Sequence, residues 1–592
     1  MSFPALHPPV TARNIHKTFR RNTGEIVNAL DGVSFEAKAG TLTALVGPDG
    51  AGKTTLLRLI CGLMAADEGE LTVVGLNVAS NPQPVQDRIG YMPQKFGLYQ
   101  DLSVRENLDF YADLHGITAA QREEVYPRLM EMTQLGRFRE RLAGKLSGGM
   151  KQKLGLACTL VRQPELLLLD EPTVGVDPLS RRELWEIVFK LVKKQGLTVL
   201  VSTSYLDEAE RCEHAVVMHQ GSVLAQGPPD DITAKANGRT FTTGPTGGMP
   251  ARSLQARLFQ QPGVIDAVPE AGKVRVVRAA ADDQSPLKAD GIAVTIQAVP
   301  PRFEDGFMML FRAVAAGDHR TTMTLARPQT GTADGMAVEV HDLVRTFGDF
   351  TAVDHVSFSV ARGEIYGLLG PNGAGKSTTF RMLCGLLPAS HGTLRVAGAD
   401  LRTSRAEARQ RLGYVAQKFS LYGQLSVDEN LEFFASAYGL RGARKTERVA
   451  WAKRQFELDQ FSRLPSGQLP GGFKQRLAMG VALLHEPEIL FLDEATSGAD
   501  PLARREFWGR ITSLSEQGVT VIVTTHFMEE AEYCDRVIIL DGGRTLAEGT
   551  PAEIRAHAEA RADHAPTMEE AFIAIVEAAR NERDAETAGS AA

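Results

Sequence analysis

The chain has 592 residues, of which 43% are hydrophobic and 23% charged, and its formal net charge is −7 at pH 7. This length exceeds what a single hydrophobic core organises, so more than one domain is expected. The negative charge disfavours a nucleic-acid partner, because a phosphate backbone usually needs a basic face. No stretch has the length and apolar character of a bilayer span, and the first ten residues do not resemble a signal peptide. The sequence therefore predicts a cytoplasmic protein that reaches a membrane only through a partner.

The five cysteines are too few and too irregularly spaced for a disulfide or zinc framework. Cys61 and Cys384 lie in matching contexts, and so do Cys212 and Cys534. We expect these thiols to be buried packing groups without a redox role.

The sequence contains an internal duplication. The run Gly-Ala-Gly-Lys occurs at 50–53 and again at 373–376, and the same spacing separates several other pairs of residues. Those pairs are Gln94 with Gln417, Gly149 with Gly472, Asp170 with Asp493, and Asp177 with Asp500. A spacing kept over so long a stretch indicates two copies of one domain.

In both copies, apolar runs of strand length alternate with helical patterns. The expected strands include 42–46, 166–169 and 198–201 in the first copy, and 489–492 and 519–523 in the second. Short buried strands separated by helices predict an α/β fold with a largely parallel sheet. We place the first domain at residues 1–227 and the second at 337–550.

The segment between the copies, 228–312, has a different pattern. Strand-like alternation and one helical pattern predict a small α+β module that belongs to the first copy. Its expected elements are strands at 240–243, 273–277 and 292–299 and a helix at 252–260.

Two further segments complete the predicted domain plan. Residues 313–336 include a stretch rich in Thr and Gly and are expected to be a linker. Residues 551–592 are expected to form a short helical segment, followed by a polar, Ala-rich tail that frays after about Asn581.

Each copy carries a G-x-x-x-x-G-K-[ST] loop between an apolar strand and a helical pattern, at 47–54 and 370–377. Glycines let backbone N–H groups converge on phosphate oxygens, and the helix N-terminus adds partial positive charge. Lys53 and Lys376 are expected to reach the β- and γ-phosphates of ATP, and Thr54 and Ser377 to bind Mg²⁺. The other residues expected at the phosphates are Gly47, Gly50, Gly52, Thr55, Gly370, Asn372, Gly373, Gly375 and Thr378.

Each copy also has an apolar strand that ends in two carboxylates, Asp170-Glu171 and Asp493-Glu494. The first carboxylate of each pair suits Mg²⁺, and the second is placed to polarise an attacking water as a general base. Together with the phosphate loops, these pairs predict an enzyme that hydrolyses ATP.

The run Leu-Ser-Gly-Gly at 146–149, upstream of Asp170, resembles the signature motif of the ABC ATPase family. Gln94 and Gln417 resemble the family's Q-loop glutamines, which contact the Mg²⁺, and 174–177 and 497–500 resemble its D-loops.

In this family two cassettes pair head to tail, and each ATP lies between one cassette's phosphate loop and the other's signature motif. The resemblance therefore implies ATP contacts from the signature residues Ser147, Gly148, Gly149, Gly471 and Gly472. Phe19 and Phe347 resemble the aromatic residue that stacks on adenine.

Three positions depart from the family pattern. Asp49 stands where the second copy has Asn372, and Ser204 stands where the second copy has His526, the family's switch histidine. Pro470 stands where the first signature has its serine, so it offers neither a hydroxyl nor a backbone donor.

Pairing of the two cassettes within one chain would collect all three departures in one composite site. Site I would combine Lys53 and Glu171 with the second signature, whereas site II would combine Lys376, Glu494 and His526 with the first signature. Our hypothesis is that site II is the main hydrolytic site and that site I binds ATP but turns over slowly.

The stretch 99–108 recurs as 422–431, and together with 177–185 it resembles ATPases of ABC-2-type exporters, including drug-efflux systems. The resemblance implies a fused ATPase subunit that serves separate integral-membrane permease subunits at the inner face of the cell membrane. The alternatives are a soluble two-cassette ATPase acting on ribosomes and the ATPase of a tandem-cassette importer. The β-rich joint and the negative charge disfavour the first, and the sequences after the signature and D-loop disfavour the second.

Overall fold

A computed structural model describes residues 8–20, 26–244, 248–283, 285–314, 335–417, 419–497, 499–559 and 566–590. The chain divides into two compact units. The first comprises residues 1–240, 277–283 and 298–316, and the second comprises 241–276, 284–297 and 317–592. Most of the expected linker, 315–334, lies outside the described residues.

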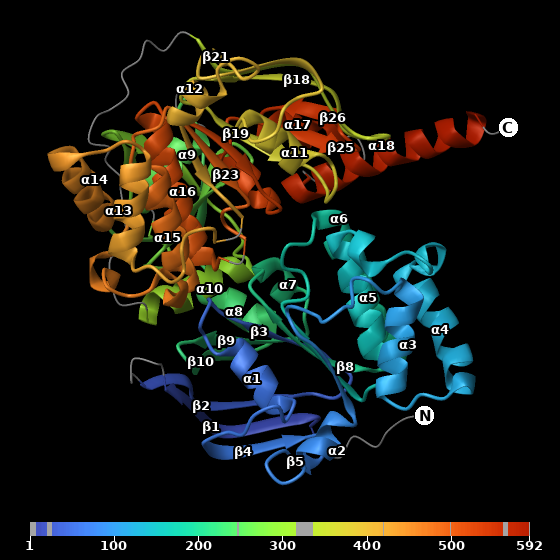
Figure 1. The fold of residues 1–592 in the computed structure, drawn as a ribbon. Helices are drawn as coiled ribbons and strands as arrows, with labels where there is room; N and C mark the ends of the chain where they lie inside the picture. Colours follow the sequence, from blue (N-terminus) through green and yellow to red (C-terminus); the bar gives the residue numbers. More distant parts are fainter. Residues whose placement is uncertain are drawn as a thin grey trace. The chain divides into compact units, whose positions relative to one another are not determined.

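The first unit is built on two sheets (Figure 1). The antiparallel sheet has the order β2-β1-β4-β5, with β1 (Val10–Arg20), β2 (Ile26–Ala37), β4 (Glu68–Val73) and β5 (Leu76–Asn77). The other sheet has the order β10-β9-β3-β8-β7-β6, with β3 (Leu42–Val46), β6 (Ile89–Met92), β7 (Leu166–Asp170), β8 (Thr198–Thr203), β9 (His214–His219) and β10 (Ser222–Gly227). Its neighbours from β6 to β9 run parallel, and β10 is antiparallel to β9.

The helices of the first unit connect these strands in a βα order. They are α1 (Lys53–Ile60), α2 (Pro82–Gln86), α3 (Val104–Leu114), α4 (Ala119–Thr133), α5 (Gly148–Leu160), α6 (Pro178–Gln195), α7 (Leu206–Glu210), α8 (Pro229–Thr233) and α10 (Phe303–Val314). Figure 1 shows α3, α4 and α5 side by side, away from the antiparallel strands β1, β2 and β4 of the same unit. Apolar side chains of β1, β2, α1 and β3 form one continuous core beneath the phosphate loop.

The second unit repeats this plan. Its antiparallel sheet has the order β18-β17-β20-β21, with β17 (Met336–Phe347), β18 (Phe350–Ala361), β20 (His391–Val396) and β21 (Ala399–Asp400). Its other sheet has the order β22-β23-β24-β19-β25-β26, with β19 (Ile365–Leu369), β22 (Leu412–Val415), β23 (Ile489–Asp493), β24 (Thr520–Thr524), β25 (Arg536–Asp541) and β26 (Arg544–Gly549). The helices are α11 (Lys376–Leu383), α12 (Arg405–Gln410), α13 (Val427–Ala437), α14 (Gly442–Gln455), α15 (Gly471–Ala482), α16 (Pro501–Glu516), the 3₁₀ segment η6 (Met528–Tyr533), α17 (Pro551–Glu559) and α18 (Met568–Ser590).

The segment between the cassettes forms a sheet of order β12-β13-β11-β16, a hairpin β14-β15 and the helix α9 (Ala251–Phe259). The strands are β11 (Thr240–Thr243), β12 (Val264–Glu270), β13 (Lys273–Arg278), β14 (Leu287–Ala289), β15 (Ile292–Val294) and β16 (Ile296–Ala298). Apolar side chains of α9, β12, β13, β14 and β15 form a core of their own, and Ile296 of β16 packs against it.

Within the second unit, α9 and β12 of this module lie against α16 and η6. Arg252 binds Asp535 through two hydrogen bonds, Nε to Oδ1 at 3.0 Å and Nη2 to Oδ2 at 2.8 Å. Arg505 of α16 forms an ion pair with Asp266 of β12, in which Nε and Oδ1 are 3.4 Å apart and both side chains are buried. The module is thus anchored to the second cassette by charged pairs, although it follows the first cassette in sequence.

The predicted α/β fold of two cassettes is confirmed, and the expected strand at 42–46 is found at those residues. The expected strand at 519–523 is displaced by one residue, to 520–524. The single strand expected at 292–299 was wrong, because the chain there contributes β15 to the hairpin and then β16 to the main sheet of the module.

The prediction of a frayed tail after Asn581 was also wrong. Helix α18 continues to Ser590, and Arg580 and Arg583 both bind the buried carboxylate of Asp541. Alanine, glutamate and arginine are strong helix formers, so this composition extends a helix once its first turns are packed. The five cysteines are all buried, as expected.

Candidate active sites

The first phosphate loop follows β3, and α1 begins at its lysine. Gly52 has φ 101°, and a Cβ there would lie 2.5 Å from the carbonyl oxygen of Ala29, so only glycine fits. The Lys53 ammonium is buried and donates to the carbonyl oxygens of Gly47 at 2.6 Å and Pro48 at 3.2 Å. The ammonium of Lys53 therefore lies within the phosphate loop, in position to contact a bound phosphate.

The second phosphate loop has the same construction. Gly375 has φ 99°, and a Cβ there would lie 2.6 Å from the carbonyl oxygen of Ala352. The Lys376 ammonium donates to the carbonyl oxygens of Gly370 at 2.6 Å and Pro371 at 3.0 Å.

The other loop residues named from the sequence occupy equivalent places in the two copies. Thr54, Thr55, Ser377 and Thr378 lie in the first turns of α1 and α11. The loops themselves hold Gly50 and Asp49 in the first copy, and Gly373 and Asn372 in the second.

Asp170 ends β7 and is held by three hydroxyl groups. Ser202 Oγ donates to its Oδ1 at 2.6 Å, Thr54 Oγ1 donates to the same oxygen at 3.0 Å, and Tyr91 Oη donates to Oδ2 at 3.3 Å. The contact with Thr54 joins two of the residues that the sequence predicts to bind Mg²⁺ in this cassette, and the third, Gln94, donates to the neighbouring Glu171. Mg²⁺ commonly uses one or two protein oxygens together with nucleotide phosphates, and this pair fits that pattern.

Asp493 has an equivalent setting in the second cassette. Thr524 Oγ1 donates to its Oδ1 at 2.8 Å, and Tyr414 Oη donates to Oδ2 at 3.3 Å. Burial raises the pKa of Asp493, and the neighbouring Glu494 adds to that rise, while the Thr524 hydroxyl opposes it. Ser377, another Mg²⁺ candidate, is exposed at the start of α11.

The sequence analysis missed four of these hydroxyl donors. Tyr91 and Tyr414 precede the Q-loop glutamines. Ser202 lies one residue before the end of β8, and Thr524 ends β24. Ser202 Oγ and Thr524 Oγ1 also accept the backbone N–H of the catalytic candidates Glu171 and Glu494, each at 3.0 Å. A comparison of the two copies would have revealed them, because each keeps a hydroxyl residue at the same place.

The two glutamates proposed as general bases differ in their partners. Glu494 Oε1 lies 2.6 Å from His526 Nε2, and Gln417 Nε2 donates to Glu494 Oε2. In the first cassette, Glu171 Oε1 lies 3.4 Å from the Lys53 ammonium, and Gln94 Nε2 donates to Oε2 at 3.4 Å.

The pKa values of the two carboxyl groups nevertheless shift in opposite directions. Burial raises the pKa of Glu171, and Lys53 only partly offsets it. Burial acts on Glu494 too, but the hydrogen bond and the charge of His526, with Lys376, outweigh it and hold the pKa of Glu494 below its ordinary value. Glu494 is therefore the better prepared of the two to stay ionised beside a nucleotide.

The residue at the switch position accounts for this difference. Ser204 and His526 follow β8 and β24 in the same local structure. The backbone N–H after Ser204 donates to Thr203 Oγ1, and the one after His526 donates to Thr525 Oγ1. A serine side chain is too short to take the place of the imidazole. The sequence departure at Ser204 thus removes a partner from Glu171.

The two signature motifs differ at the N-terminus of the helix that follows. Ser147 caps α5, because its Oγ accepts the backbone N–H of Met150 at 3.3 Å, and Gly148 and Gly149 form the first turn. Pro470 precedes α15, which begins at Gly471 and Gly472 and has no side-chain cap. The backbone angles at Ser147 and Pro470 are similar, so the two helix starts differ in the side-chain cap and not in the course of the backbone.

The two candidate adenine-stacking residues are both surface aromatics. Phe19 is 41% exposed near the end of β1, and Phe347 is 47% exposed at the end of β17. Neither ring belongs to a core, and Lys17 and Arg345 lie beside them. Their role in ATP binding stays a prediction.

No group of three or more His, Cys, Asp or Glu side chains among the described residues could by itself hold a metal ion. No helix in the same part of the chain combines the length and apolar character that crossing a membrane requires.

Comparison with known proteins places these sites in a family. The family model described as ABC transporter matches residues 30–174 and 353–497, which contain both phosphate loops and both acidic pairs. The chain is 50% identical to the "Probable multidrug ABC transporter ATP-binding protein YbhF" of Escherichia coli over 570 residues, which are 96% of this chain and 97% of that protein.

Two further relatives match over one cassette. The "Nod factor export ATP-binding protein I" of Ralstonia nicotianae is 41% identical over 39% of this chain and 72% of its own length. The "Linearmycin resistance ATP-binding protein LnrL" of Bacillus subtilis is 39% identical over 37% of this chain and 70% of its own length. With its duplicated ATP-binding geometry, the chain belongs to the ABC transporter family, as an ATP-binding protein with two cassettes in tandem and thus an ABC transporter ATPase.

Proposed function

We propose that this ATPase powers the export of a substrate, drug-like in character, through separate ABC-2-type permease subunits at the inner face of the cell membrane. The support is the 50% identity, along nearly the whole chain, to a protein named as the ATP-binding part of a probable multidrug transporter. The two single-cassette relatives are named for Nod factor export and for linearmycin resistance.

An exposed aromatic pair in each cassette supports contact with a partner. Tyr99 and Phe110 are 4.5 Å apart between ring centroids, and Tyr422 and Phe433 are 5.1 Å apart. Between 37% and 51% of each of these residues is exposed, although large aromatic residues are usually mostly buried. Both pairs follow a Q-loop glutamine, the region in which we expect a permease helix to dock.

We further propose that the two cassettes pair head to tail and hydrolyse ATP unequally. Site II, built on Lys376 and Glu494 and completed by Ser147, would be the main hydrolytic site. Site I, built on Lys53 and Glu171 with Pro470 opposite, would bind ATP and turn over slowly. The observation that carries this asymmetry is that His526 contacts Glu494, whereas the first cassette has Ser204 at the same position.

In this proposal the chain's own residues carry the chemistry at site II. Lys376 turns from the loop carbonyls to the phosphates, and Glu494 orients an attacking water and accepts its proton. His526 keeps Glu494 ionised and fixes its rotamer, and Gln417 holds the second carboxylate oxygen. Asp493 and Ser377 would hold a Mg²⁺, which would neutralise charge on the β- and γ-phosphates.

Co-purification tests the export assignment. The tagged full chain is expressed in bacterial cells that carry its permease candidates, and membranes are solubilised in mild detergent. We expect integral-membrane subunits to co-purify, and we expect the double variant Phe110→Ser, Phe433→Ser to lose them while its ATP binding persists. Recovery of ribosomal subunits in place of membrane subunits would contradict the proposal.

A further inference from the structure

The α+β module binds one face of the second cassette, formed by α16 and η6. Helix α9 lies beside α16 (Figure 1), and both α9 and β12 contact η6. Arg505 and Glu516 of α16 both pair with the module, and they are three helical turns apart, so they lie on the same side of the helix. Asp266 is the partner of Arg505, and Arg257 Nη1 donates to Glu516 Oε1 at 2.9 Å. One helix face thus presents a cation and an anion to the module.

The strongest contacts of this interface are buried. Arg252 binds both carboxylate oxygens of Asp535, and the Arg252 side chain is 10% exposed. The ion pair between Arg505 and Asp266 is buried as well. A buried charge that loses its partner is strongly destabilising, so these pairs make the interface specific for a surface that carries the matching charges.

The equivalent face of the first cassette carries different residues. The places of Arg505, Thr512, Glu516 and Asp535 are taken by Arg182, Phe189, Lys193 and Glu213. Lys193 would meet Arg257 of the module as a like charge, which is unfavourable. Phe189 is larger than Thr512, which is fully buried on the same side of α16 as Glu516. The first cassette therefore matches the module less well than the second.

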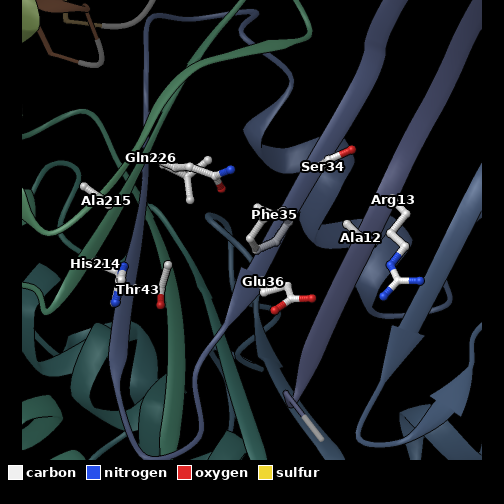
Figure 2. A pocket seen from close by; sticks show the side chains of 11 residues that line it. Ala12, Arg13, Ser34, Phe35, Glu36, Thr43, His214, Ala215 and Gln226 are labelled. Carbon is white, nitrogen blue, oxygen red and sulfur yellow. The ribbon is translucent and has the colours of Figure 1, made fainter.

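This face is also more exposed in the first cassette. The side chain of Arg182 is 37% exposed, compared with 7% for Arg505, and Glu213 is exposed. Next to Glu213, His214 and Gln226 line an open groove (Figure 2). The charges that the first cassette keeps thus lie at its surface, whereas those of the second lie under the module.

We propose that the module is a clasp that holds the second cassette to the first cassette of the same chain. The chain joins the module directly to the first cassette, and the charged contacts on α16 and beside η6 join it to the second. The clasp selects a second cassette over a first, because the second carries the complete set of matching charges. It keeps one cassette of each kind together at a high local concentration, which the proposed head-to-tail pairing requires.

Cutting the chain between the module and the second cassette tests the clasp. A protease site is placed in the segment 315–334, so the module stays on the fragment that contains the first cassette. The cut chain is kept free of nucleotide, so that ATP cannot hold the cassettes together. Size-exclusion chromatography with light scattering follows the fragments over a dilution series. We expect them to co-elute at micromolar concentration with the mass of the intact chain.

Two matched pairs of variants locate the contact. Arg505→Glu should weaken the association of the fragments at least about hundredfold, because it opposes the buried Asp266, whereas Arg182→Glu in the first cassette should leave it unchanged. Glu516→Lys introduces the first cassette's residue at a partly exposed pair, so the chain should fold normally, and it should weaken the association about three- to tenfold. Lys193→Glu is its control and should have no effect.

Three results would overturn the proposal. The first is separation of the wild-type fragments at micromolar concentration. The second is unchanged association in Arg505→Glu and Glu516→Lys, with folding of the uncut variants checked by circular dichroism. If Arg505→Glu does not fold, Glu516→Lys decides. The third is an equal loss of association in Arg182→Glu and Arg505→Glu, which would remove the selectivity for the second cassette. None of these measurements depends on ATP turnover or on the export assignment.

Discussion

Replacing His526 by alanine should slow ATP hydrolysis at the second cassette by about one to two orders of magnitude. His526 Nε2 lies 2.6 Å from Glu494 Oε1, and both side chains are buried. A hydrogen bond to a charged group contributes about 1.5–3 kcal/mol. If the full energy of this hydrogen bond is lost from the transition state, kcat falls about 10- to 150-fold, because each 1.36 kcal/mol of activation free energy changes the rate about tenfold.

The same substitution should shift the acid limb of the pH–rate profile. His526 holds the pKa of Glu494 below its ordinary value against the effect of burial. Without the imidazole, burial dominates, as it does at Glu171, and the pKa of Glu494 rises. Activity that the wild type retains as the pH falls should therefore be lost at a higher pH in the variant.

Phosphate release from purified His526→Ala, measured across pH at saturating ATP, supplies both quantities. Ser204→Ala is the matched control, because the first cassette already lacks the imidazole, and it should change kcat very little. An equal loss in the two variants, or an acid limb that does not move in His526→Ala, would refute the reasoning.

Two further predictions concern packing. Asp266→Ala removes the carboxylate that pairs with the buried guanidinium of Arg505, at a cost of about 3–5 kcal/mol in stability. Amide hydrogen exchange in α9 and β12 should therefore become faster. Unchanged exchange there would show that the ion pair does not anchor the module. Gly149→Ala should loosen the α5–α6 contact by about 1–3 kcal/mol, because its Cβ would lie 2.3 Å from Ser180 Cβ. Gly472→Ala is the control. A Cβ at position 472 would have no described atom within 4 Å beyond its own helix backbone and chain neighbours. Equal hydrogen exchange in the two variants would contradict the prediction.

The cassettes were predictable from sequence because their elements are locally encoded. Each phosphate loop has an apolar run before it and glycines inside it, and these residues determine strand, turn and helix over a short stretch of sequence. The paired carboxylates mark the end of another strand, and the same pattern occurs in both copies. The segment 292–299 was less predictable, because its alternation is the same whether one strand continues or the chain passes from one sheet to another. In the C-terminal helix, Arg580 and Arg583 bind Asp541, a contact that local composition does not reveal.

The residues of the candidate active sites that belong to sequence motifs were also predictable. Lys53, Lys376 and the acidic pairs follow from motifs, and the lack of a histidine at position 204 is visible in the sequence. The consequence for Glu171 and Glu494 needed the structure, because opposite pKa shifts arise from burial and from partners distant in sequence.

Unequal hydrolysis by the two cassettes can be measured by comparing Glu494→Gln with Glu171→Gln. Both substitutions keep the size of the side chain and remove its charge, and phosphate release is measured under identical conditions at saturating ATP. We expect Glu494→Gln to abolish most of the activity and Glu171→Gln to retain most of it. Equal losses in the two variants would contradict this expectation.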